Sequence, residues 1–130
     1  TKILFSTNFE TGGLTLGARA TYFGDVKAFS TGLSASDSNV KCNVTNRCVQ
    51  TFGAKTIFDL NATYAFTESF GLTLGVNNLF DTYPDKIAPT ATNPVYALTN
   101  SLADGQVYPR SGGPFGINGG FYYVRVAIDY

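Results

Sequence analysis

A repeated alternation of apolar and polar residues is the feature that most constrains the fold of this chain. In the segment 119–130, GGFYYVRVAIDY, every even position from Tyr122 to Tyr130 is apolar or aromatic, while Arg125 and Asp129 occupy odd positions. Successive side chains of a strand point to opposite faces, so this segment predicts a strand with one apolar and one polar face. A strand of a soluble sheet can show the same pattern, so the pattern alone does not decide the environment.

The same alternation recurs upstream and predicts an all-β fold. It is clearest in TIFDLNATYAF, where Asp59, Asn61 and Thr63 occupy the polar positions between apolar neighbours. Each repeat is close to the length that a tilted strand needs to cross a bilayer. The expected strands are 2–9, 14–23, 56–66, 70–80 and 119–130.

Short and long connections alternate between the expected strands. The segments ETGG at 10–13 and TES at 67–69 are signals for tight turns between neighbouring strands. The connections 24–54 and 81–118 are long, lack the alternation and hold all five prolines, which lie in 81–118 and do not fit a central strand. Outer-membrane barrels have short periplasmic turns and long extracellular loops. The order therefore predicts a segment of an antiparallel transmembrane β-barrel, with 24–54 and 81–118 as extracellular loops.

The composition limits the chemistry that this chain can perform. Its 130 residues fit one domain, and its 9 basic and 9 acidic residues cancel, so no nucleic-acid partner is expected. Histidine is absent, which removes most metal and acid–base chemistry. We therefore expect no catalytic residue, no metal ligand and no cofactor site, and we do not expect an enzyme. A transmembrane helix is excluded because no run of about 18 apolar residues occurs.

The two cysteines, Cys42 and Cys48, lie in a polar stretch without strand pattern. They can form a small disulfide-closed loop in an oxidising compartment, or they can act as a pair of metal-binding thiolates. A structural zinc site needs about four ligands, and two thiols without histidine fall short, which favours the disulfide. So small a ring would contribute about 2 kcal/mol, mainly to the loop itself.

Two segments resemble the C-terminal region of TonB-dependent outer-membrane receptors. The first is FDLNATYAFTESFGLTLGVNNLFDTYP at 58–84, whose core GVNNLFD spans Gly75–Asp81 and is followed by Tyr83 and Pro84. The second is GPFGINGGFYY at 113–123, which is similar to the segment that introduces the last strand of such receptors. Gly113 departs from the pattern, since serine is frequent there. The resemblance is specific from about Thr56 onward and generic before it.

The resemblance implies a receptor in the bacterial outer membrane that imports a scarce nutrient, such as a ferric siderophore, cobalamin or a glycan. Transporters of this family have about 22 strands and a plugged lumen, so about five strands imply the C-terminal part of a larger barrel. The start at Thr1, without a methionine or signal peptide, fits a fragment or a mature product. The implied partners are outer-membrane lipid, the plug and remaining strands, the TonB–ExbB–ExbD complex through the missing N-terminal part, and the barrel-assembly machinery.

The resemblance and the loops also suggest particular residues. An aromatic C-terminus after apolar residues of one parity resembles the signal for barrel assembly, although these residues can equally be simple lipid-facing positions: Tyr122, Val126, Ile128 and Tyr130. Loops on a rigid scaffold carry binding, so three loop tyrosines can stack on a ligand or pack the loop itself: Tyr83, Tyr96 and Tyr108. Four charged residues on the polar faces are suited to ion pairs inside a lumen: Arg19, Asp59, Arg125 and Asp129.

A second hypothesis is a small autonomous outer-membrane β-barrel or adhesion module without active transport. It needs more strands than the alternation predicts. These additional strands would have to lie inside the long connections, around 41–52 and 93–99.

Overall fold

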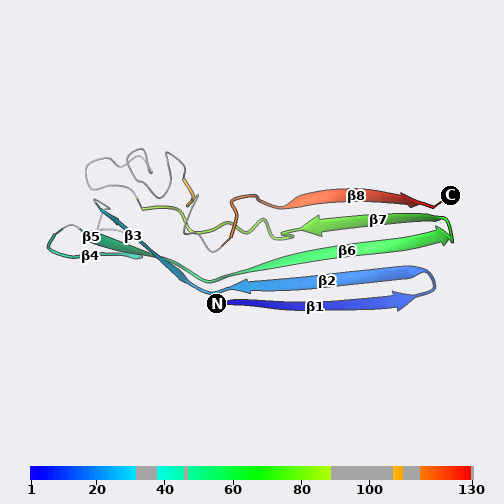
Figure 1. The fold of residues 1–130 in the computed structure, drawn as a ribbon, viewed down its shortest axis with the longest axis horizontal. Coiled ribbons are helices and arrows are strands. Elements are labelled where there is room, and N and C mark those ends of the chain that lie inside the picture. The colour runs from blue at the N-terminus through cyan, green and yellow to red at the C-terminus, as the bar shows by residue number, and fades with distance from the viewer. Residues whose placement is uncertain (32–37, 46, 89–106, 110–114, 130) are drawn as a thin grey trace. The chain divides into compact units, whose positions relative to one another are not determined.

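The structure, a computed structural model, describes residues 1–31, 38–45, 47–88, 107–109 and 115–129. These residues form two open antiparallel sheets and contain no helix, which confirms the expected all-β, antiparallel class (Figure 1). Within the described ranges, no helix has the length and apolar character needed to cross a membrane. The strands are β1 (Lys2–Thr11), β2 (Leu14–Phe23), β3 (Val26–Thr31), β4 (Val40–Cys42), β5 (Arg47–Phe52), β6 (Lys55–Thr67), β7 (Phe70–Asn77) and β8 (Phe121–Ile128).

The larger sheet has five strands in the order β1-β2-β6-β7-β8. Figure 1 shows that neighbouring strands run in opposite directions and that the turns from β1 to β2 and from β6 to β7 lie at the same end of the sheet. Gly12 and Gly13 form the first turn with φ values of 51° and 81°. Positive φ at both central residues is typical of the tight hairpin turn that matches strand twist, and glycine adopts it without strain.

The cross-strand register aligns the apolar residues of one strand with the apolar residues of its neighbour, and the polar residues with the polar ones. Ala62 pairs with Leu74, and Leu74 pairs with Val124, so one row of the sheet is apolar on three strands. The next row joins Thr63, Thr73 and Arg125 on the opposite face, where the two threonine hydroxyl oxygens lie 2.9 Å apart. A shift of one residue would exchange the faces, so the apolar pattern of each strand supports the same register.

The strand β7 is shorter than the expected range 70–80 and ends at Asn77. Asn78 and Asp81 both have φ of 52°, so the chain turns away from the sheet at this point. Asn and Asp tolerate this left-handed conformation better than other residues with a side chain. The last strand, β8, lies inside the expected range 119–130, and Tyr130 lies outside the described residues.

The smaller sheet lies within the connection 24–54, where the sequence predicted no strand, and it contains three strands in the order β3-β5-β4. The buried side of β5 carries Cys48, Gln50 and Phe52, so a polar residue interrupts the apolar positions. These strands are also short, with 6, 3 and 6 residues. Two of them, β4 and β5, overlap the range 41–52 where an autonomous barrel would need strands, but with β3 they form a separate sheet. The range 93–99 lies outside the described residues.

The chain divides into two compact units. One, the sheet unit, comprises 2–22, 56–82 and 119–130; the other, the loop unit, comprises Thr1, 23–55 and 83–118. Among the described residues, the buried apolar side chains of the core all belong to the loop unit: Ala28, Val40, Cys48, Phe52, Ile87 and Ala88. The loop unit therefore has a small core of its own, and the sheet unit leaves its apolar side chains in half-buried or exposed positions.

Candidate functional site

The apolar face of the five-stranded sheet carries no charged side chain on any described strand. Large side chains on this face are exposed, with exposed fractions of 66% for Phe5, 51% for Leu74 and 67% for Val124. Its residues are Ile3, Phe5, Thr7 and Phe9 of β1; Leu14, Leu16, Ala18, Ala20 and Tyr22 of β2; Thr56, Phe58, Leu60, Ala62, Tyr64 and Phe66 of β6; Phe70, Leu72, Leu74 and Val76 of β7; and Tyr122, Val124, Val126 and Ile128 of β8.

Aromatic rings border this face at both ends of the strands. Near the start of β6, the ring of Phe58 contacts Phe80 edge-on, with centroids 5.5 Å apart. Near its end, Phe66 contacts Tyr64 at 4.8 Å and Phe70 at 5.3 Å. Eight steps of about 3.4 Å separate the two β6 phenylalanines along the strand, which is about 27 Å. A tilt of about 40° reduces this to about 21 Å, close to the ~25 Å apolar band of outer-membrane barrels.

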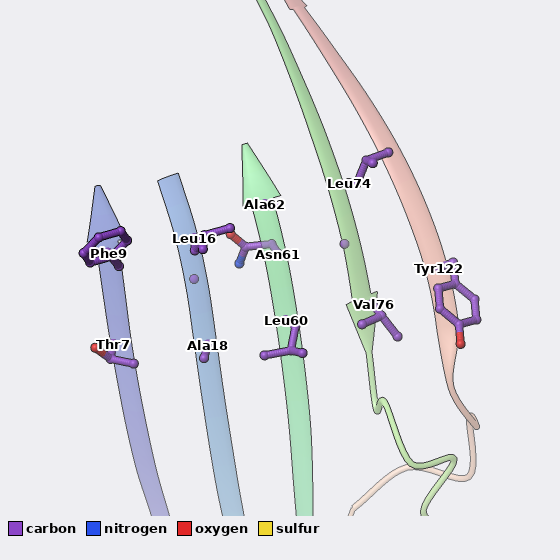
Figure 2. A pocket seen from close by; sticks show the side chains of 12 residues that line it. Thr7, Phe9, Leu16, Ala18, Leu60, Asn61, Ala62, Leu74, Val76 and Tyr122 are labelled. Carbon is purple, nitrogen blue, oxygen red and sulfur yellow. The ribbon is translucent and has the colours of Figure 1, made fainter. Parts of the chain in front are cut away.

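A shallow hollow of about 550 Å³ lies in the middle of the apolar face. Figure 2 shows it across all five strands, with Phe9 and Leu16 on one side and Leu74 and Tyr122 on the other. Ala18 and Ala62 belong to its lining, and their small side chains leave the central strands without bulk. Its lining is almost entirely apolar, so it offers no polar group to orient a specific solute.

The opposite, polar face of the sheet contains an ion pair between β2 and β6. Arg19 Nη2 lies 2.7 Å from Asp59 Oδ2, and Arg19 Nε donates a hydrogen bond of 2.8 Å to the same oxygen. These are two of the four charged residues suggested for lumen ion pairs. The Arg19 side chain is 53% exposed, so the pair contributes little to stability in water and mainly neutralises this part of the face.

The GVNNLFD segment of the resemblance forms a hydrogen-bonded turn after β7. The Asn78 side chain is buried and bonds the backbone of Thr82 twice, donating to its carbonyl and accepting from its N–H at 2.8 Å each. The Asn78 N–H donates to Asp59 Oδ1 at 2.8 Å, and the Asp81 carboxylate accepts from the N–H of Gly120 at 2.7 Å. The turn therefore joins the ends of β6, β7 and β8.

Gly120 is required for this closure. A Cβ atom at this position would lie 2.6 Å from the backbone oxygen of Asn78, a distance at which the backbone would have to move. Asn78, Asp81 and Gly120 lie inside the two segments of the resemblance, but no role was predicted for them. Asp81 and Gly120 are 39 residues apart, so the local sequence gives no signal of the hydrogen bond between them.

In the loop unit, the Gln50 side chain is fully buried and holds the segment 86–88 on the smaller sheet. Its Nε2 donates to the carbonyl of Lys86 at 2.8 Å, and its Oε1 accepts from the N–H of Ala88 at 3.1 Å. Both ends of the amide are satisfied, as a buried polar group requires. Sequence reasoning missed Gln50 because one polar residue in a polar stretch is not a signal for burial.

Asp85 forms a second link between the two long connections. Its carboxylate lies 2.7 Å from Lys55 Nζ and accepts a hydrogen bond of 2.6 Å from the N–H of Gly53. Partial burial by itself raises the pKa of Asp85, but the hydrogen bonds from Lys55 and Gly53 and the Lys55 charge outweigh it and hold this pKa below its ordinary value. The carboxylate is therefore ionised at neutral pH.

Cys42 and Cys48 form a disulfide across the directly paired ends of β4 and β5, one of the two interpretations of the sequence. Inside the ring that it closes, the Asn43 side chain accepts hydrogen bonds from the backbone N–H groups of Thr45 and Arg47 at 3.1 and 2.9 Å. Across the described ranges, no group of three or more His, Cys, Asp or Glu side chains is placed to hold a metal ion. The tip of this hairpin is thus closed both covalently and by hydrogen bonds.

Two of the three loop tyrosines contact each other. The rings of Tyr83 and Tyr108 stack with centroids 5.3 Å apart and planes 15° from parallel, while Tyr96 lies outside the described residues. Next to this stack, the N–H of Ile87 donates to the carbonyl of Val107 at 2.9 Å. The two parts of the long connection 81–118 are therefore in contact where the structure describes them.

Three of the residues suggested as an assembly signal lie on the apolar face of β8. The exposed fractions are 82% for Tyr122, 53% for Val126 and 65% for Ile128, and Tyr130 is not among the described residues. Their role in assembly stays a prediction.

No protein-family model matches this chain, and neither the curated proteins nor the solved structures contain a match to it.

Proposed function

We propose that this chain is the C-terminal portion of a TonB-dependent outer-membrane receptor that imports a scarce nutrient, such as a ferric siderophore, cobalamin or a glycan. The observation that carries the proposal is the uncharged apolar face, five strands wide and bordered by aromatic rings at both ends of the strands. Lipid-facing surfaces of outer-membrane barrels have this arrangement, with aromatic girdles on both sides of an apolar band.

The free energy of solvation favours lipid over water as the environment of this face. Removing a Val, Leu, Ile or Phe side chain from water stabilises a protein by about 1.5–3 kcal/mol, and on this face many such side chains are exposed. Soluble monomers rarely expose contiguous apolar patches above a few hundred Å². Lipid acyl chains would cover the whole face without requiring any polar or charged partner on the sheet.

The edges of the sheet support a longer barrel. The strands β1 and β8 each have one neighbour among the described strands, so each has an outer edge of backbone N–H and carbonyl groups open to pairing. Exposed edges of this length favour aggregation, and closure of a barrel removes them. In the proposed receptor, further strands would pair with both edges, and a plug would block the lumen.

The loop unit would face the outside of the cell and capture the ligand. Its two long connections leave from the ends of β2 and β7, opposite to the short turns, as in outer-membrane barrels. Its core, its disulfide and the Gln50 hydrogen bonds would hold ligand-facing side chains in place before binding, which lowers the entropy lost on binding. TonB–ExbB–ExbD would act through the N-terminal part, and the barrel-assembly machinery would insert the chain.

The test begins with the intact polypeptide that carries this chain, isolated from bacterial membranes. We expect N-terminal sequencing and intact mass to reveal several hundred upstream residues, and we expect the protein in the outer-membrane fraction with a heat-modifiable gel mobility. A protein found only in the soluble fraction would contradict the proposal. A membrane protein that begins at Thr1 would instead favour the small autonomous barrel or adhesion module.

A further inference from the structure

The polar face of the sheet unit contains a row of four residues in which two small glycines alternate with two larger side chains. Gly17, Asn61, Gly75 and Tyr123 lie on β2, β6, β7 and β8, and the register pairs Asn61 with Gly75 and Gly75 with Tyr123. A Cβ atom on Gly75 would lie 2.5 Å from both Cε1 and Oη of Tyr123. A Cβ atom on Gly17 would lie 2.7 Å from both polar atoms of the Asn61 amide. The two larger side chains therefore lie across the glycines.

Beside the Tyr123 ring is a hollow of about 260 Å³ on the polar face. Unlike the hollow on the apolar face, it is lined mainly by polar groups: Ser6, Asn8, Asp59, Asn61, Asn77 and Tyr123. Amide and hydroxyl groups both donate and accept hydrogen bonds. The volume corresponds to about nine waters at ~30 Å³ each, which is sufficient for a ring of about a dozen heavy atoms.

The charge of the hollow favours a neutral ligand. Its two charged lining residues, Arg19 and Asp59, are paired with each other at 2.7 Å. An anion or a cation would have to separate this pair or leave its own charge without a partner. A neutral molecule with many hydroxyl groups can bind without separating the ion pair and without burying an unpaired charge.

We propose that this hollow binds a neutral pyranose ring of a glycan, with the ring stacked on Tyr123 and its hydroxyl groups bonded to Asn61 and Asn77. A pyranose has an apolar C–H face and a polar rim, which match an aromatic ring beside amide groups. The inference rests on the proposed function, because the polar face then lines the lumen through which the solute passes. It selects the glycan among the three nutrient classes.

The experiment measures glycan binding by the intact polypeptide in detergent micelles. An immobilised array of neutral, sulfated and sialylated oligosaccharides identifies ligands, and calorimetry with the best soluble neutral oligosaccharide gives a Kd. We expect binding of neutral glycans. Tyr123→Ala should weaken binding by about 10-fold or more, and Tyr123→Phe by less than about 3-fold, because the ring face remains. Val124→Ala, on the adjacent residue and the opposite face, is the matched control and should bind as the wild type.

A second variant protects the test against a folding defect in Tyr123→Ala, since this change uncovers Gly75. Asn77→Ala keeps the ring in place and should weaken binding by about 5-fold through loss of one hydrogen bond. Wild-type affinity in both Tyr123→Ala and Asn77→Ala would overturn the proposal and leave the ring as a cover for the glycine. Binding of only charged glycans, or of none, would overturn it as well.

The failure of this inference is distinguishable from the failure of the proposed function. Outer-membrane fractionation and heat-modifiable mobility are measured on the same preparations. A correctly inserted protein that binds no neutral glycan contradicts only the binding site. A protein absent from the outer membrane contradicts the receptor, whatever the array shows.

Discussion

Arginine at position 74 tests whether lipid covers the apolar face of the sheet. Leu74 lies near the middle of β7, directly opposite Ala62 of β6 and Val124 of β8, and it is 51% exposed. With no carboxylate on this face, an arginine there would have no partner. Near the midplane of a bilayer, Leu74→Arg should cost about 2–4 kcal/mol. On a water-exposed sheet, the same change should stay within about 0.5 kcal/mol.

The matched control is Thr73→Arg, one residue away on the polar face. This change removes the hydroxyl contact of 2.9 Å between Thr63 and Thr73, at a cost of about 1 kcal/mol. It also places two arginines opposite each other, because Thr73 pairs with Arg125, which adds up to about 1 kcal/mol of repulsion. Salt screens this repulsion in a hydrated lumen, so the Thr73→Arg cost should fall with added salt while the Leu74→Arg cost does not.

The assay is equilibrium unfolding of the intact polypeptide by urea in phospholipid vesicles, followed by far-ultraviolet circular dichroism and by gel mobility. The free energy of unfolding is compared among wild type, Leu74→Arg and Thr73→Arg at low and high salt. Equal costs for the two variants at high salt would refute the assignment of the faces. A Leu74→Arg cost below about 0.5 kcal/mol would refute the lipid environment.

Three further predictions concern the hydrogen-bonded links in the loop unit and after β7. Gln50→Leu keeps the size of the side chain but removes both hydrogen bonds of the amide and leaves the buried N–H of Ala88 without its Gln50 acceptor. It should cost about 1–3 kcal/mol locally, seen as faster hydrogen exchange of the Ala88 amide. Asp81→Ala should cost about 1–2 kcal/mol and speed exchange of the Gly120 amide, whereas Asp81→Asn, which retains an acceptor and tolerates positive φ, should cost less. Folding lowers the pKa of Asp85, so the ionised carboxylate stabilises the loop unit fully above the unfolded pKa of 3.8. This stabilisation is lost as the pH falls through the lower folded-state pKa. Asp85→Asn should remove this acid sensitivity when the stability of the loop unit is measured as a function of pH.

Each of these predictions has a contrary result. Unchanged exchange at Ala88 in Gln50→Leu would mean that the segment 86–88 is held by other contacts. Equal effects of Asp81→Ala and Asp81→Asn would show that backbone conformation, and not the acceptor, is decisive. An acid transition that is the same in Asp85→Asn would assign it to another carboxylate.

The amino-acid sequence by itself determined the strands of the larger sheet and their two faces. Alternation with period two is a local property, so it is visible along TIFDLNATYAF without knowledge of the neighbouring strand. Gly12 and Gly13 likewise mark a hairpin, because positive φ at two successive positions is cheap only for glycine. The absence of charge from the even positions of β6, β7 and β8 follows from the same pattern.

Only the tertiary structure decided which residues far apart in the sequence form hydrogen bonds or pack against each other. The β3-β5-β4 sheet escaped prediction because Gln50 lies on its buried side, and a glutamine is tolerated there only through bonds to Lys86 and Ala88, 36 and 38 residues away. The Asp81–Gly120 hydrogen bond and the Tyr123 ring across Gly75 are equally non-local. Hydrogen bonding and close packing depend on positions in space, and the identity of one residue carries no information about a partner that the fold brings to it from elsewhere in the chain.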